Sequence, residues 1–131
     1  MNHLDHTQEI LRQLIAYPTI SADSNLQLIE YLADYLDHLG ADVLLNHAPD
    51  GTKANLFATL GQGHENGVLL SGHTDVVPVA DQDWSHDPFD MIERDGRLYG
   101  RGTCDMKGFI AACLSKAHDY ANLPLKTPVH F

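Results

Sequence analysis

Apolar residues recur at helical spacing in two stretches of the first 40 residues. In the first stretch they fall largely on one helical face, and Pro18 ends the pattern: Leu4, Ile10, Leu11, Leu14 and Ile15. In the second stretch they run from Leu28 to Leu39, and Gly40 is a natural helix stop. Ser24 with Gln27 has the form of a capping box. The pattern therefore predicts two amphipathic helices.

The following segments carry strand patterns. Residues 42–46 (DVLLN) and 55–61 (NLFATLG) predict two strands around a polar turn. Residues 67–72 (GVLLSG) are short, mostly apolar and bounded by glycine, which predicts a strand buried on both faces of a sheet. Asp95-Gly96, inside DMIERDGRLYG, suits a type I′ turn and predicts a hairpin.

The spacing becomes helical again near residue 106. The apolar positions follow the i, i+3, i+4, i+7 pattern of a helix packed on a sheet: Met106, Phe109, Ile110, Cys113, Leu114 and Ala117. We expect Asp105 at the N-cap of this helix and Lys107 exposed in its first turn. The last residues, VHF, have the pattern of a strand. Helices and strands in this order predict an α/β layered architecture.

Composition narrows the class of protein. The chain has 131 residues, which suits about one domain, and its formal net charge is −10. Such acidity argues against a nucleic-acid or anionic-membrane surface. Two cysteines without metal-type or disulfide spacing indicate a reducing, cytoplasmic setting, and no secretory signal or membrane-spanning run is visible. We expect a cytoplasmic protein without nucleic-acid or membrane partners.

Two candidate catalytic side chains follow the third predicted strand. His73 and Asp75 stand two residues apart at its carboxyl end, where open α/β sheets bind ligands. In extended backbone both side chains point the same way, so the carboxylate can hold one imidazole nitrogen and leave the other for a metal. For this pair alone, a hydrogen bond that only closes the strand end, without a metal, is the favoured explanation.

The loop YGRGTCDMKGF holds a third candidate. A dinucleotide-binding loop would have a third glycine where Asp105 stands, and a carboxylate there repels phosphate from a helix N-terminus. The loop is therefore not built for an anion. Asp105 is either an ordinary N-cap or a metal ligand. A serine hydrolase is disfavoured, because Ser71 is too close to His73 along one strand and no Gly-x-Ser-x-Gly elbow exists.

The two stretches together narrow these alternatives. SGHTDVVP, then DPF, then DGRLYGRGTCDMKG before a helix resembles the aminoacylase and acetylornithine deacetylase family of two-metal peptidases and deacylases. The resemblance covers the whole chain. It implies that His73 ligates one metal, that Asp105 bridges two metals, and that Asp75 is the active-site carboxylate that orients His73. It also implies two Zn²⁺ per complete site, with Co²⁺ as a substitute.

The same resemblance implies a fold and a reaction. The fold is a three-layer α/β/α zinc-peptidase-like catalytic domain, of which residues 1–131 form the N-terminal part, without the dimerisation domain. Family members are homodimers and have a glutamate pair as general base and ligand. No such pair occurs here, since the glutamates are isolated: Glu9, Glu30, Glu65 and Glu93. We therefore interpret the chain as an N-terminal fragment.

The expected reaction is hydrolysis of a small N-acetyl amino acid. Removal of the acetyl group from N2-acetyl-L-ornithine, which gives L-ornithine and acetate in arginine biosynthesis, is the first hypothesis. A deacylase for another N-acyl amino acid or for succinyl-diaminopimelate, or a dipeptidase, is the alternative. A non-catalytic truncated remnant is the alternative of another class, and we favour it for the isolated 131 residues.

Overall fold

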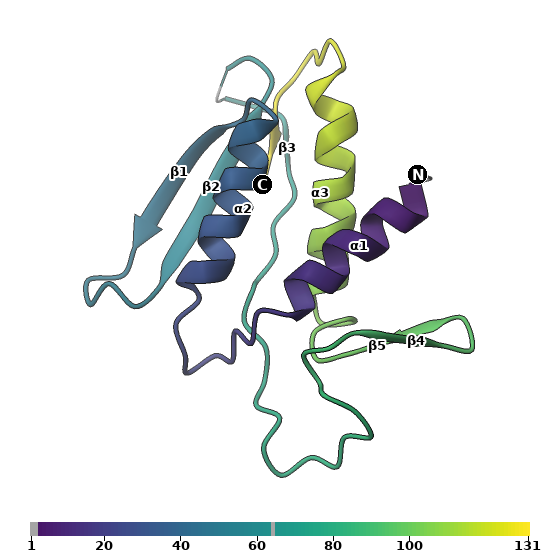
Figure 1. Ribbon diagram of the computed structural model, residues 1–131. Helices are drawn as coiled ribbons and strands as arrows, with labels where there is room; N and C mark the ends of the chain where they lie inside the picture. Colours follow the sequence, from purple (N-terminus) through teal and green to yellow (C-terminus); the bar gives the residue numbers. More distant parts are fainter. Residues whose placement is uncertain (1–2, 64) are drawn as a thin grey trace.

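The computed structural model describes residues 3–63 and 65–131 (Figure 1). Within these residues one mixed sheet has the strand order β1-β2-β6-β3. Its strands are β1 (Asp42–His47), β2 (Ala54–Leu60), β3 (Val68–Leu69) and β6 (Val129–His130). The helices are α1 (His3–Ile15), α2 (Leu26–His38) and α3 (Lys107–Ala121). A separate hairpin consists of β4 (Ile92–Arg94) and β5 (Arg97–Tyr99).

The two N-terminal helices confirm the periodicity, but the predicted capping box is wrong. Gly40 has φ +83°, as a glycine stop requires. The N-cap of α2 is Asn25 and not Ser24, whose hydroxyl instead accepts a hydrogen bond from the amide of Leu26 at 3.3 Å. The Asn25 side chain pairs with both backbone groups of Ala54, each at 3.0 Å. Asn25 therefore connects the start of α2 to β2.

The strands β1 and β2 and the hairpin also confirm the sequence patterns. β1 and β2 are antiparallel, and their register pairs Leu44 with Phe57. Asp95 and Gly96 have φ values of +53° and +70°, which is the requirement of a type I′ turn.

The prediction of a fully buried third strand is wrong. β3 has only two residues, Val68 and Leu69, whose exposed fractions are 55% and 56%. It pairs in parallel with β6 at the edge of the sheet. An apolar run becomes buried only when neighbouring elements cover it. Among the described residues, no further strand lies beyond β3 at this edge of the sheet.

Helices cover one face of the sheet. Leu32 of α2, Leu56 of β2 and Leu114 of α3 line one shared groove, so α2 and α3 lie on the same side. On the opposite face the paired residues Leu44 and Phe57 are 64% and 41% exposed. The α/β class is confirmed. The described residues form two of the three layers expected of the complete domain. None of their helices combines the length and the apolar character that a membrane span requires.

The apolar stripe predicted for α3 is divided between two environments. Leu114 and Ala117 are buried, as predicted, but Phe109 is 41% exposed and Cys113 only partly buried. Ala111 and Ser115 are buried instead, because α3 packs closely against α1 (Figure 1). The small side chains of this second face permit the close approach of the two helices, whereas the larger apolar residues face the groove beside the sheet.

Candidate active site

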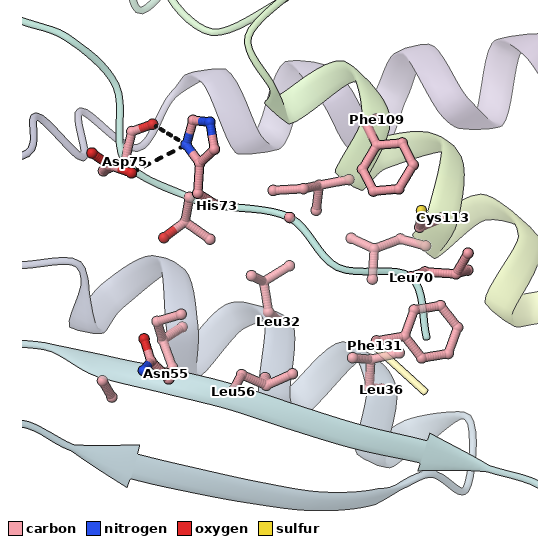
Figure 2. Close-up of a pocket in the computed structure, with 16 residues that line it drawn as sticks. Leu32, Leu36, Asn55, Leu56, Leu70, His73, Asp75, Phe109, Cys113 and Phe131 are labelled. Atoms are coloured by element: carbon pink, nitrogen blue, oxygen red, sulfur yellow. Dashed lines mark hydrogen bonds and ion pairs between the residues drawn. The ribbon is translucent and has the colours of Figure 1, made fainter. Parts of the chain in front are cut away.

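His73 and Asp75 lie in the extended segment after β3, and their side chains meet as the spacing predicts. The Nδ1 atom of His73 is 3.1 Å from Oδ1 of Asp75 and 3.1 Å from its backbone oxygen. Figure 2 shows both contacts as dashed lines at one end of the groove. Nδ1 donates to this oxygen pair, so the Nε2 atom is directed away from Asp75.

Asp105 completes a contact that connects two distant parts of the chain. Its Oδ1 atom is 3.0 Å from Nε2 of His73. The prediction that Asp105 is an N-cap is wrong, since Met106 has that position and forms no side-chain cap hydrogen bond. The Asp105 side chain is 83% exposed and turns toward His73 instead of the helix amides. His73 therefore has a carboxylate at each ring nitrogen.

The electrostatics of the cluster follow from these contacts. Burial opposes protonation of His73, but the hydrogen bonds to the Asp75 backbone oxygen and to the Asp105 carboxylate raise its pKa overall. The hydroxyl of Ser21, followed by the charge of His73, lowers the pKa of Asp75. A cation that binds Nε2 has to replace a proton held there, so its affinity should fall in acid.

Ser21 is a member of this cluster that the sequence did not indicate. Its hydroxyl donates a hydrogen bond to Oδ2 of Asp75, the oxygen that His73 does not use. The two residues are far apart along the chain, and a serine in a loop after a helix carries no local signal of such a contact.

Lys107 was predicted to be exposed, and this prediction is wrong. Its side chain is completely buried, and Nζ donates to the backbone oxygens of Leu14 and Tyr17 at 2.8 and 2.6 Å. Burial lowers the pKa of Lys107 to about 8. Gly102, whose φ is +94°, leaves room for both Val76 and Lys107, because a Cβ atom there would lie 2.9 Å from Cγ1 of Val76 and 3.2 Å from Cδ of Lys107. Lys107 thus connects the loop that bears Asp105 to the end of α1.

An apolar groove extends from His73 between α2, α3 and β2. Its walls are mainly aliphatic and aromatic, and its polar end is formed by His73, Thr74 and Asp75 (Figure 2). The labelled apolar side chains in Figure 2 are Leu32, Leu36, Leu56, Leu70, Phe109 and Phe131. His73 and Asp75 therefore stand at one end of a mainly apolar groove.

The donor atoms fit a divalent cation of the zinc type. An imidazole nitrogen and a carboxylate oxygen face each other on exposed side chains, and zinc accepts both kinds of ligand. Asp75 is placed as the carboxylate that fixes the other ring nitrogen of a ligating histidine. Residues 3–63 and 65–131 contain no compact group of three or more such side chains able to hold a metal ion on their own.

Sequence comparison identifies relatives of this chain. Residues 69–131 match the family model described as "Peptidase family M20/M25/M40". The chain is 47% identical, over 98% of its length, to acetylornithine deacetylase from Shigella sonnei (strain Ss046). It spans 35% of that relative's length.

Solved structures show the same fold. Human carnosine dipeptidase 1 is 28% identical with a TM-score of 0.78, and the match covers 98% of this chain and 31% of the dipeptidase. An M20 family metallo-carboxypeptidase from Sulfolobus solfataricus has a TM-score of 0.81 at 24% identity, over 99% of this chain and 30% of that enzyme. The second likeness concerns the fold alone.

Proposed function

Because this chain belongs to peptidase family M20/M25/M40, we propose that its protein hydrolyses N2-acetyl-L-ornithine to L-ornithine and acetate. The 47% identity to acetylornithine deacetylase carries this proposal. The relatives are hydrolases of amide bonds, and the His73–Asp105 contact supplies side chains of the type that such an enzyme needs.

We propose that His73 holds one metal ion and that Asp105 bridges two. Zn²⁺ suits these ligands, and Co²⁺ is the natural substitute. Such ions activate water and polarise the amide carbonyl at neutral pH. Asp75 keeps Nδ1 of His73 as the donor, so Nε2 can give its lone pair to a metal once the proton that faces Asp105 has left. The remaining ligands and the general base are proposed to come from residues other than those described.

The apolar groove beside His73 offers a place for the aliphatic part of a substrate or for another element of the complete domain. A second candidate substrate is a dipeptide, because human carnosine dipeptidase 1 is 28% identical to this chain. Succinyl-diaminopimelate and other N-acyl amino acids are further candidates within the same chemistry. The complete protein is proposed to be a cytoplasmic homodimer that acts in arginine biosynthesis.

A chimeric enzyme tests the proposed reaction. Residues 1–131 replace the corresponding third of the Shigella sonnei deacetylase, and ornithine release is measured with Zn²⁺ or Co²⁺ present. We expect hydrolysis of N2-acetyl-L-ornithine in preference to succinyl-diaminopimelate and dipeptides. His73→Ala and Asp105→Ala should abolish it. A folded chimera that cleaves only a competing substrate, or none, contradicts the proposal.

A further inference from the structure

The backbone of Ser21 is fixed beside the active-site segment without help from its side chain. Its amide donates to the backbone oxygen of Val76 at 3.0 Å, and the Val76 amide donates to that of Thr19 at 2.9 Å. Ile20 and Val76 form a parallel bridge. The hydroxyl of Thr19 donates to the backbone oxygen of Thr74 at 2.6 Å. Replacing the Ser21 side chain should therefore leave the loop in place.

The Ser21 hydroxyl and His73 contact different oxygens of the Asp75 carboxylate. Ser21 donates to Oδ2, while Nδ1 of His73 lies 3.1 Å from Oδ1. A carboxylate engaged at both oxygens cannot rotate without losing a hydrogen bond. The Asp75 side chain is 49% exposed, so water competes for any oxygen that is released.

The hydroxyl has one proton, and the carboxylate is its better acceptor. The backbone oxygen of Val76 also lies 3.3 Å from Oγ, but the contact with Asp75 is shorter and charge-assisted. Ser21 is not arranged as a nucleophile, because it is bonded to the carboxylate and not to the imidazole that would have to accept its proton.

We propose that Ser21 is a positioning residue that holds the Asp75 carboxylate against His73. His73 then keeps Nδ1 as the donor and directs Nε2 toward Asp105, 3.0 Å away. Ser21, Asp75, His73 and Asp105 form one continuous line of contacts from the loop after α1 to the loop before α3. What Nε2 binds in this geometry rests on the proposed function.

The first test needs no metal. Three-bond couplings between the backbone nitrogen and Cγ of Asp75, measured by NMR on the labelled 131-residue chain, report whether the side chain keeps one χ1 rotamer. We expect one rotamer in the wild type and in Ser21→Thr. We expect averaged couplings in Ser21→Val, because valine has the shape of threonine without the hydroxyl. Ser21→Ala is the second hydroxyl-free variant. Ser24→Ala, in the same loop, is the matched control and should resemble the wild type.

The second test uses the metal-free chimera with the Shigella sonnei deacetylase, which supplies the remaining ligands, and takes the unmutated chimera as the wild type. It measures Zn²⁺ affinity by calorimetry, with His73→Ala as the blank. We expect Ser21→Val and Ser21→Ala to bind about tenfold more weakly and Ser21→Thr to retain wild-type affinity. A single Asp75 rotamer in both hydroxyl-free variants overturns the proposal, as does unchanged Zn²⁺ affinity. Averaged couplings without any Zn²⁺ binding by the wild type uphold the role of Ser21 in orienting Asp75 and contradict the metal site.

Discussion

At the scale of single residues, a buried lysine connects the loop before α3 to the end of α1. Lys107 donates to two backbone oxygens near the end of α1, each of which also accepts a hydrogen bond from a backbone amide. Its neighbour two residues earlier is Asp105, which contacts His73. The position of the proposed bridging carboxylate therefore depends on a cation that is itself fully buried.

Lys107→Met should destabilise the chain. The substitution keeps an unbranched apolar stem but removes two buried hydrogen bonds, although the oxygens of Leu14 and Tyr17 keep the backbone amides of Tyr17 and Thr19 as donors. A hydrogen bond from a charged donor contributes about 1.5–3 kcal/mol, so the free energy of unfolding in urea should fall by about that amount. Lys116→Met is the control on the same helix, because Lys116 is half exposed and, among the described residues, pairs with the carboxylate of Asp119. Equal urea midpoints for the two variants would show that the buried hydrogen bonds contribute nothing.

The sequence predicts some of the side-chain contacts at the site and not others. The i, i+2 spacing predicts that His73 and Asp75 meet, because backbone geometry alone brings them together. Ser21, Lys107 and the turn of Asp105 away from the helix are not predictable in this way. Each depends on a partner far along the chain, and only Gly102, whose missing side chain admits Lys107, gives a local sign.

At the scale of elements, the first turn of α3 is where packing overrides helix propensity. Gly108 stands inside the helix, where alanine is ordinarily preferred. A Cβ atom at this position would lie 2.3 Å from the backbone oxygen of Thr103, in the loop that leads to Asp105. The glycine thus permits the close return of that loop onto the helix.

Gly108→Ala should therefore destabilise the chain instead of stabilising it. We expect the free energy of unfolding to fall by about 1–3 kcal/mol, the usual cost of forcing an extra carbon into a packed site. Chemical denaturation followed by circular dichroism measures this change. A gain in stability, as propensity alone predicts, would refute the close packing of the loop.

The edge strand β3 is the element most exposed to self-association. Among residues 3–63 and 65–131 its partner strand is β6 alone, and Val68 and Leu69 are more than half exposed. Leu69→Lys should reduce oligomers seen by size-exclusion chromatography at high protein concentration, since charge on an edge strand prevents pairing between molecules. Leu4→Lys is the control, because Leu4 is 65% exposed on a helix. Equal reduction by both variants would point to general solubility, not to the edge.

Most elements follow from local patterns, while burial does not. The two N-terminal helices, the β1–β2 pair and the hairpin are predicted because periodicity and turn residues are local properties. The exposure of β3 and the divided face of α3 depend on which elements lie beside them. The sequence of a single stretch cannot supply that information.

At the scale of the whole molecule, one face of the sheet is covered by helices and the other is exposed. α2 and α3 cover one face of the sheet, whereas Leu44 and Phe57 on the other face remain exposed. The chain spans 35% of the length of its deacetylase relative, and the ionisable side chains that its described residues bring together at the site are His73, Asp75 and Asp105. We therefore propose that further residues of the complete protein are needed to finish the catalytic centre.

The isolated 131 residues should be inactive. Without further ligands and a general base, the cluster cannot complete a two-metal site. Incubation with N2-acetyl-L-ornithine and Zn²⁺ or Co²⁺ should release ornithine no faster than the metal alone. Turnover that disappears in His73→Ala would contradict this expectation.

The proposed function requires His73 and Asp105 to hold metal ions. Metal analysis of the purified chimera with the Shigella sonnei enzyme, alongside its His73→Ala and Asp105→Ala variants, measures this requirement. We predict about two zinc ions per chain in the parent chimera. Each substitution should remove at least one ion, provided that the variant keeps the parent's circular dichroism spectrum. Full zinc content in both folded variants would contradict the assignment of either residue as a ligand.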